Sequence, residues 1–576
     1  MIGIHGIISS TFLNNKIKSI LDEKEKGDLE NIPNGILAKV SLNKFKDDDI
    51  FYKFKNGLIA VNGVILNLKK LLVDNKANNL GELLIKFYSD NPYSFPSKLE
   101  GSFQGFIYIM KENKLIIFTD HKSSRPIFYF YDDDNDILIF SASFTKIVKL
   151  LKDIGIQPEL NEESAYCLLT FGHMISDLTL VNKVKKLPPG TILTYHNGCI
   201  QLNKYYEITN YPQISSNEDE MKYEIFKKLS KAVYLEYIKD LENNYEHLAL
   251  LSGGLDSRVS LALAKKLGFK NITCITYSQS RYLDQKIASK ICRDHGLKHL
   301  FFPLEYGDYL IKFVDEVINF NGGLASYIGV CNLFTWLKNL NLNKYGILHT
   351  GLLGGEIFGE YCTTWKRGYD SLRYFIYGKI SKEILLQNSN LQRLLDRELS
   401  KYGNMDLFKF YNIGVNAQLV NLHVINQFID TMSPFINTHV LDYVMKIPKK
   451  KKLNKNIYVK MFNQYFQDFA WYTWEAYKVP PKISMNRFKA YNSALRLINN
   501  KLSILMPYYS MNPFDYYYRK NLFLKKGYYN IFNNNINLLK NHSRLMDDCK
   551  ILFSEGNFFE KAAVITLLKA IEILKL

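Results

Sequence analysis

The sequence predicts a mixed α/β protein with three parts, at residues 1–210, 221–490 and 491–576. Short alternating runs broken by turns predict strands and hairpins throughout the first part. In the second part, a strand, a glycine-rich turn, a helix and another strand follow in order over 247–277, which is typical of a parallel sheet. In the third part, apolar residues at helical spacing over Phe558–Leu574 predict a docked terminal helix.

Within this outline, the expected elements follow in a definite order. Two helices are expected among the strands of the first part, over 80–88 and 162–171, and its last strand over 191–195. The polar stretch 211–220 contains proline, serine and asparagine, a composition typical of a linker. The second part then opens with four elements: a helix over 220–241, a strand over 247–251, a helix over 258–267 and a strand over 271–277.

The composition is that of an ordinary folded protein. Of the 576 residues, 47% are hydrophobic and 23% charged, which disfavours disorder and collagen-like repeats. Seven cysteines lie far apart and never as Cys-x-x-Cys, so no disulfide framework or zinc knuckle is expected. The sequence shows no secretory signal and no apolar stretch long enough to span a bilayer. The cytoplasm is therefore the expected location.

The formal net charge is +18, and a surface this basic attracts polyanions such as nucleic acid, acidic lipid, nucleotide or an acidic peptide. The sign of the charge does not choose among them. We interpret the run Lys449–Lys452 as a solvated turn between helices, so nucleic acid is not an expected partner. The histidines show no metal-ligand spacing, since His295 and His299 straddle a glycine, and no zinc site is assigned.

The most specific chemical signal is a glycine-rich turn between an apolar strand and a helix. It comprises Ser252, Gly253, Gly254, Leu255, Asp256 and Ser257. Backbone N–H groups of such a turn and the helix N-terminus can face phosphate oxygens, with serine hydroxyls as further donors. Asp256 supplies a carboxylate for magnesium. The turn has neither a Walker nor a dinucleotide glycine pattern; an ordinary strand-to-helix turn is the alternative.

This turn resembles the pyrophosphate-binding loop of the ATP pyrophosphatase superfamily, in which ATP is split to AMP and pyrophosphate. Two later segments narrow the resemblance to asparagine synthetases. The stretch Thr350–Tyr361, which includes Gly351, looks like their second loop, and Ser433–Asn437 is similar to their Pro-Phe-Leu-Asp segment. The resemblance implies ATP and Mg²⁺ as cofactors, with Gly351 and the glycine-rich turn binding ATP and pyrophosphate.

The first part is similar to the glutaminase domain of the same family. The matching motifs stand in the family's order: Gly3-Ile-x-Gly6, Asn62-Gly63, Leu99–Phe103, Arg125–Tyr129 and Leu187–Gly190. The resemblance covers about residues 1–490 and implies an Ntn-type αββα domain, followed by a parallel-sheet ATP pyrophosphatase domain. Ile2, however, stands where that glutaminase has its nucleophilic cysteine, and Val64 where it has a glutamate that grips glutamine. We therefore expect no glutamine hydrolysis and interpret the first domain as a scaffold.

Family members that lack this cysteine include β-lactam synthetases and the cyclases that close lasso-peptide macrolactams. The resemblance implies a ligase that adenylates a carboxylate and joins it to an amine of the substrate itself, with lasso-type cyclisation as the leading case. A peptide or small carboxylate is the expected substrate, with a precursor peptide and a leader protease as partners. Two alternatives remain: an ammonia-dependent amidotransferase acting on a small acid or sugar acid, and a binding protein without turnover.

The second loop departs from the family pattern at two positions. Gly355 replaces the second magnesium-binding aspartate, and Leu352 replaces a catalytic-site glutamate. Glu356 is the candidate substitute for the missing carboxylate, both in catalysis and as a second metal ligand; a helix-capping role is the alternative.

The candidate catalytic cation is Lys478, in a segment that resembles one near the close of the family's synthetase domain. A cation there can neutralise the pyrophosphate leaving group and the developing oxyanion. Lys482 and Lys460 compete for the role because the spacing differs from the family's by a residue.

Overall fold

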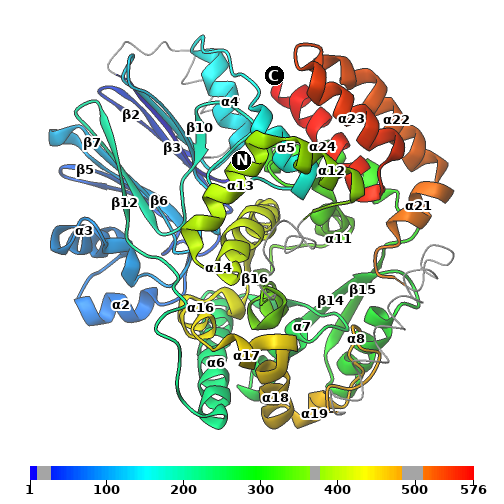
Figure 1. Cartoon of the computed structure of the whole chain (residues 1–576). Coiled ribbons are helices and arrows are strands. Elements are labelled where there is room, and N and C mark those ends of the chain that lie inside the picture. Colours follow the sequence, from blue (N-terminus) through cyan, green and yellow to red (C-terminus); the bar gives the residue numbers. More distant parts are fainter. Residues whose placement is uncertain (10–26, 363–375, 483–509) are drawn as a thin grey trace.

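The computed structural model describes residues 1–9, 27–362, 376–482 and 510–576 (Figure 1). Two antiparallel six-stranded sheets form the first part. One sheet has the order β10 (Val184–Lys186), β8 (Phe128–Asp132), β9 (Ile137–Ser141), β1 (Gly3–Ser9), β3 (Gly35–Val40), β2 (Gly27–Ile32). The other has the order β12 (Cys199–Lys204), β11 (Thr191–His196), β7 (Lys114–Thr119), β6 (Gly101–Ile109), β5 (Gly57–Ile65), β4 (Phe51–Phe54).

Helices cover the outer faces of both sheets, so the first part has four layers. Apolar side chains such as Ile4 and Phe106 fill the space between the sheets. The outer face of the β5–β6 sheet is covered by α2 (Leu68–Asn75) and α3 (Leu80–Asp90). The outer face of the β1–β9 sheet is covered by α4 (Phe144–Asp153) and α5 (Glu162–Phe171). The predicted αββα architecture is confirmed, and both predicted helices are present.

The second part contains a five-stranded sheet in which every neighbouring pair is parallel, as predicted. The strand order is β15 (Lys298–Pro303), β14 (Ile272–Ser278), β13 (Glu246–Leu250), β16 (Tyr345–His349), β17 (Asp430–Met432). The helix α6 (Glu218–Glu242) precedes β13, α7 (Asp256–Lys266) connects β13 to β14, and α8 (Leu283–Asp294) connects β14 to β15. Because β13 and β16 are parallel neighbours, the segments that follow them emerge at the same sheet edge.

The described segments between β15 and residue 482, which exclude residues 363–375, are mainly helical. The principal helices are α10 (Val314–Asn321), α12 (Lys379–Gln387), α13 (Ser389–Tyr402), α14 (Met405–Lys409), η7 (Phe410–Leu419), α15 (Val420–Ile425), α16 (Thr438–Met445), α17 (Lys449–Lys452) and α18 (Asn456–Tyr465). The expectation of a solvated turn at Lys449–Lys452 is wrong. These residues form the short helix α17, and Lys452 is buried, with its ammonium 3.1 Å from the Asp406 carboxylate.

The carboxyl-terminal extension consists of α21 (Phe514–Lys520), α22 (Leu522–Asn535), α23 (Ser543–Glu555) and α24 (Phe558–Leu574). The predicted terminal helix is confirmed with the predicted bounds. It is apolar almost all round, and α24 contacts α5 of the first part as well as α10, α22 and α23 (Figure 1). The predicted boundary between 490 and 491 lies outside the described residues. None of the described helices is long and apolar enough to cross a membrane.

A buried charged network holds α6 against the carboxyl end of β16. The Asp240 carboxylate lies 2.9 Å from Nδ1 of His247 and 2.8 Å from Nε2 of His349, and Glu236 lies 3.5 Å from Nδ1 of His349. Burial alone would lower the pKa of His349, but the Asp240 and Glu236 carboxylates outweigh burial and raise it to about 9. The ring of Tyr237 stacks on this imidazolium at 3.7 Å.

The charge on His349 predicts a specific dependence of stability on pH. A folded-state pKa above the ordinary value of 6.5 means that the stabilisation is complete below pH 6.5 and is lost as the pH rises through about 9. We expect His349→Gln to lower the free energy of unfolding. The loss should be larger at pH 6.5 than at pH 10 by about 3 kcal/mol, because each pKa unit corresponds to about 1.36 kcal/mol. Thermal unfolding of both proteins across this range measures the gap. The exposed His439→Gln is the control, and a pH-independent gap for His349→Gln would contradict the assignment.

Candidate functional site

One cavity of about 880 Å³ lies at the sheet edge where β13 and β16 end. We call residues 251–257 the first loop and residues 350–356 the second loop. Both loops line the cavity, together with residues from the first part, from η7 and α15, and from the extension. The two loops are 99 residues apart in the chain, yet five of the predicted phosphate-binding residues line one space: Ser252, Gly254, Asp256, Ser257 and Gly351. Gly253 and Leu255 do not line it, and of the second loop only residues 350–352 do.

The first loop is a tight turn in which backbone N–H groups donate hydrogen bonds to serine hydroxyls of the same loop. The Ser252 N–H donates to the Ser257 hydroxyl at 3.1 Å, and the Gly254 N–H donates to the Ser252 hydroxyl at 3.1 Å. The Gly253 N–H donates to Asp284 at 2.6 Å, and a Cβ at Gly253 would approach Glu475 to 2.8 Å. The sequence analysis missed Asp284, which lies buried on α8.

Asp284 has an unusual acidity for a carboxyl group. Burial, and then the nearby Glu475 carboxylate, raise the pKa of Asp284 to about 7. Asp284 also lines the cavity. Only the folded chain brings Asp284 to the first loop, so local spacing carried no signal for it.

The second loop closes directly on Asp256, the first residue of α7. The Gly355 N–H donates to the Asp256 carboxylate at 2.9 Å, and the Tyr458 hydroxyl donates to its other oxygen at 3.0 Å. A Cβ at Gly351 would lie 2.4 Å from the Ser257 nitrogen, and one at Gly354 would lie 2.7 Å from the Asp256 Cγ. This approach requires glycine.

Glu356 and Glu360 add two carboxylates beside Asp256. The half-buried Glu356 accepts a hydrogen bond from the Gln418 amide at 3.0 Å. Burial, and then the charges of Asp256 and Glu360, raise the pKa of Glu356 to about 7. Leu352 lines the cavity, and its carbonyl accepts a hydrogen bond from the Ser433 hydroxyl at 2.8 Å.

A cation that the sequence analysis missed, Lys455, lies among these carboxylates. Its ammonium is 2.5 Å from Glu360, and a Cβ at Gly355 would lie 2.4 Å from the Lys455 Nζ. Burial opposes the charge, but Asp256 and Glu360 raise the pKa of Lys455. Lys455 therefore fills the space beside Gly355, where the family resemblance places a second aspartate. The backbone of Lys455 is left-handed, with φ of 59°. This conformation favours glycine, so a lysine at this position does not reveal it in the sequence.

The three predicted lysines lie in different surroundings. Lys478 lies 2.8 Å from Glu475, whose backbone N–H donates to the Gly253 carbonyl at 2.9 Å, so Lys478 is connected to the first loop. Lys482 lies over the exposed Trp471 ring, and Lys460 is 2.6 Å from Glu218. None of these three lysines is among the described lining residues of the cavity.

In the first part, the positions that the resemblance assigns to glutamine chemistry have other contacts. The Ile2 N–H donates to the Gln427 side chain at 2.9 Å. Val64 is fully buried in an apolar cluster with Ile347 and Met432 of the parallel sheet. These contacts join the two parts and offer no polar group to a glutamine amine.

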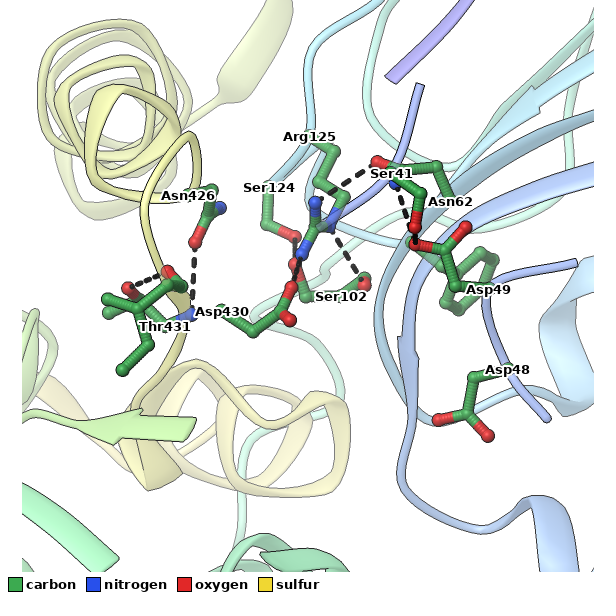
Figure 2. Close-up of polar contacts among 12 residues, drawn as sticks. Ser41, Asp48, Asp49, Asn62, Ser102, Ser124, Arg125, Asn426, Asp430 and Thr431 are labelled. Carbon is green, nitrogen blue, oxygen red and sulfur yellow. Dashed lines mark hydrogen bonds and ion pairs between the residues drawn. The ribbon is translucent and has the colours of Figure 1, made fainter. Parts of the chain in front are cut away.

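Arg125 lies beside Asn62-Gly63 (Figure 2). Its guanidinium donates to the Asn62 side-chain oxygen at 3.1 Å and to the Ser102 carbonyl at 3.2 Å. Arg125 also forms a buried ion pair with Asp430 on β17. A Cβ at Gly63 would lie 2.9 Å from the Arg125 Nε, so the guanidinium packs against the backbone of this pair.

Comparison with known proteins agrees with this architecture. Residues 37–206 match the family described as a glutamine amidotransferase domain. Asparagine synthetase [glutamine-hydrolyzing] 1 of Bacillus subtilis is 22% identical over 284 residues, 48% of this chain and 43% of the relative. This chain therefore spans less than half the length of that relative. These matches support an asparagine synthetase-like relationship.

A solved structure, titled as the allosteric regulatory enzyme of purine biosynthesis, is 11% identical, with 52% of this chain and 74% of that chain covered. Its TM-score of 0.23 is too low to support an argument about the site.

The contacts of Ile2, Val64 and Arg125 predict that the protein does not hydrolyse glutamine. Glutamate formation from labelled glutamine should not exceed that of a heat-denatured sample, with the Bacillus subtilis relative as the positive control. Ile2→Cys alone should not restore hydrolysis, because Val64 still offers no polar group and Arg125 still packs on Gly63. Glutamate release by the wild-type chain would contradict this interpretation.

Proposed function

We propose that this chain is an ATP-dependent ligase that adenylates a substrate carboxylate and joins it to an amine without hydrolysing glutamine. The main observation in support of this proposal is the hydrogen bond between the second loop and Asp256, at a cavity that both loops line. The similarity to an asparagine synthetase supports the ligase class. The leading specific case is macrolactam closure within a peptide, with a precursor peptide and a leader protease as partners.

The first loop suits the phosphates of ATP. It lies between a buried parallel strand and the N-terminus of α7, an arrangement in which backbone N–H groups and hydroxyls can face anions. Asp284 and the Ser252 hydroxyl accept hydrogen bonds from two of these N–H groups, so bound phosphate oxygens would compete for the same donors.

The surroundings of Asp256 fit a divalent cation. Three carboxylates, Asp256, Glu356 and Glu360, lie near one ammonium, Lys455, and this leaves an excess of negative charge. Asp256 would hold Mg²⁺, with Glu356 as the second carboxylate once it has lost its proton. Bound Mg²⁺ would neutralise the charge of the phosphate oxygens.

The proposed reaction has two steps. A carboxylate oxygen of the substrate attacks the α-phosphorus of ATP, and the bond to pyrophosphate breaks. The amine nitrogen then attacks the acyl carbon, the bond to AMP breaks, and the amine gives up a proton. Lys455 and Lys478, which pair with Glu360 and Glu475 beside the loops, are the candidate cations for stabilising the pyrophosphate leaving group, although neither lines the cavity. Asp284, with a pKa of about 7, is the candidate proton acceptor.

The alternative enzymatic function is that of an ammonia-dependent amidotransferase that acts on a small acid or sugar acid. Mass separates the two activities, because cyclisation removes one water from the substrate while amidation adds nitrogen. A non-catalytic binding protein is the remaining alternative, and the absence of pyrophosphate release with every substrate tested would favour it.

Asp256→Asn tests the proposed function most directly. The change removes a metal-binding charge from the point where the two loops meet, so AMP formation from ATP and Mg²⁺ should fall at least about 100-fold. Asp294→Asn, at the exposed end of α8, is the matched control and should keep wild-type rates. Products are separated by chromatography after incubation with a mixture of linear peptides. Formation of ADP in place of AMP would refute the assignment.

Lys455→Met and Lys478→Met distinguish the two candidate cations. Loss of the cation that stabilises the leaving group should reduce AMP formation by about 10²–10³-fold, while calorimetry shows a much smaller change in ATP affinity. We expect the larger loss for Lys455→Met, because Lys455 lies closer to Asp256 and Gly355. Lys460→Met is the control, since Lys460 pairs with Glu218 outside the cavity. A larger loss for Lys478→Met would assign the role to Lys478.

A further inference from the structure

The cavity has two chemically different ends. The end formed by the loops carries the acidic residues Asp256, Asp284 and Glu475. The rest of the lining, which we call the chamber, consists largely of aliphatic and aromatic side chains, among them Val330, Ile413, Leu422, Phe514 and Phe559. ATP chemistry accounts for the loop end only, so the chamber is available to the second reactant.

Four amide side chains are among the polar groups that line the cavity, beside hydroxyl groups and an imidazole. Asn332, Gln418, Asn421 and Asn512 line it, and the side-chain oxygen of each is buried without a protein hydrogen-bond partner among the described residues. These oxygens are shielded from the cavity, and a turn of the amide group would present them to a ligand N–H, which would recover the cost of about 1–3 kcal/mol of an unpaired buried carbonyl. Because an amide offers a donor as well as an acceptor, it pairs well with another amide.

Lysine and arginine are absent from the described lining residues of the cavity. An anionic group in the chamber would therefore find no lysine or arginine among the described lining residues with which to pair. A cationic group would find no carboxylate in the described lining other than those of Asp256, Asp284 and Glu475. The net charge of +18 thus says little about what the chamber prefers.

We propose that the chamber binds a peptide segment with uncharged, apolar side chains, whose main-chain amides pair with the four amide side chains. The proposal deepens the proposed ligase function, on which it rests for the role of the segment as substrate. Gln418 connects the two ends, since its amide nitrogen donates to Glu356 beside the second loop. A peptide seated in the chamber would thus reach the loops with its reacting group.

The carboxyl-terminal extension contributes directly to this selectivity. Asn512 and Phe514 come from the segment that leads into α21, and Phe559 from the first turn of α24. The ring centroids of Phe514 and Phe559 are 5.7 Å apart in an edge-on arrangement, and Phe559 is 41% exposed. The extension is therefore a wall of the chamber as well as a support for α5.

Equilibrium binding of two capped tetrapeptides to the full-length protein tests the chamber. The probes are acetyl-Gly-Leu-Phe-Gly-amide and acetyl-Gly-Asp-Glu-Gly-amide, followed by saturation-transfer difference NMR and calorimetry. We expect the apolar peptide to bind at least tenfold more tightly than the acidic one. Equal affinity, or tighter binding of the acidic peptide, would overturn the proposal.

Two substitutions locate the binding. Ala417→Phe fills the chamber, and Asn421→Leu removes an amide at nearly constant size; each should weaken the apolar peptide at least tenfold. Leu538→Phe, on the exposed surface of the extension, is the control. ATP affinity and the melting temperature show whether each variant is folded. A folded Ala417→Phe protein that binds the peptide as wild type does would place the site elsewhere.

The binding measurements and the AMP assay can reject the chamber and the ligase function independently of each other. Peptide binding that depends on Ala417 and Asn421, without AMP formation, would retain the chamber and reject the ligase. AMP formation with a small charged acid, without binding of the apolar peptide, would retain the ligase and reject the chamber.

Discussion

The close approach of the second loop to Asp256 is the constraint on which the site depends. The approach needs β13 and β16 to be neighbours, because only then do both loops leave the same sheet edge. It also needs residues without a Cβ, since side chains at Gly351 and Gly354 would collide with the first turn of α7. The buried imidazolium of His349 holds the end of β16 against α6 and so determines where the second loop begins.

A second constraint is the buried ion pair between Arg125 and Asp430, which joins the first part to β17. Removing one partner of such a pair typically costs about 3–5 kcal/mol, because the other charge is left buried and unpaired. Since the same guanidinium packs on Asn62-Gly63, a position associated with glutamine chemistry serves here to join two domains. This contact fixes the first domain to the parallel sheet of the second.

The sequence predicted features that depend on neighbours in the chain and missed those created by tertiary contacts. The first loop was predicted because its glycines and serines stand next to a buried strand. The terminal helix was predicted because its apolar periodicity runs over 17 residues. Asp284 and Lys455 were missed because only the folded chain brings them to the loops. Lys452 was placed in solvent because its burial depends on Asp406, 46 residues away.

The distribution of charge connects the outer surface to the cavity. The chain carries +18 overall, yet the described cavity lining holds carboxylates at one end and neutral groups at the other. Such a lining favours a metal-bound nucleotide over a free polyanion at the loop end, because the carboxylates repel bare phosphates until a divalent cation offsets their charge. At the chamber end, selectivity comes from apolar burial and from unpaired amide groups, both independent of net charge. The two ends therefore discriminate by different forces, and changes in one should leave the selectivity of the other largely intact.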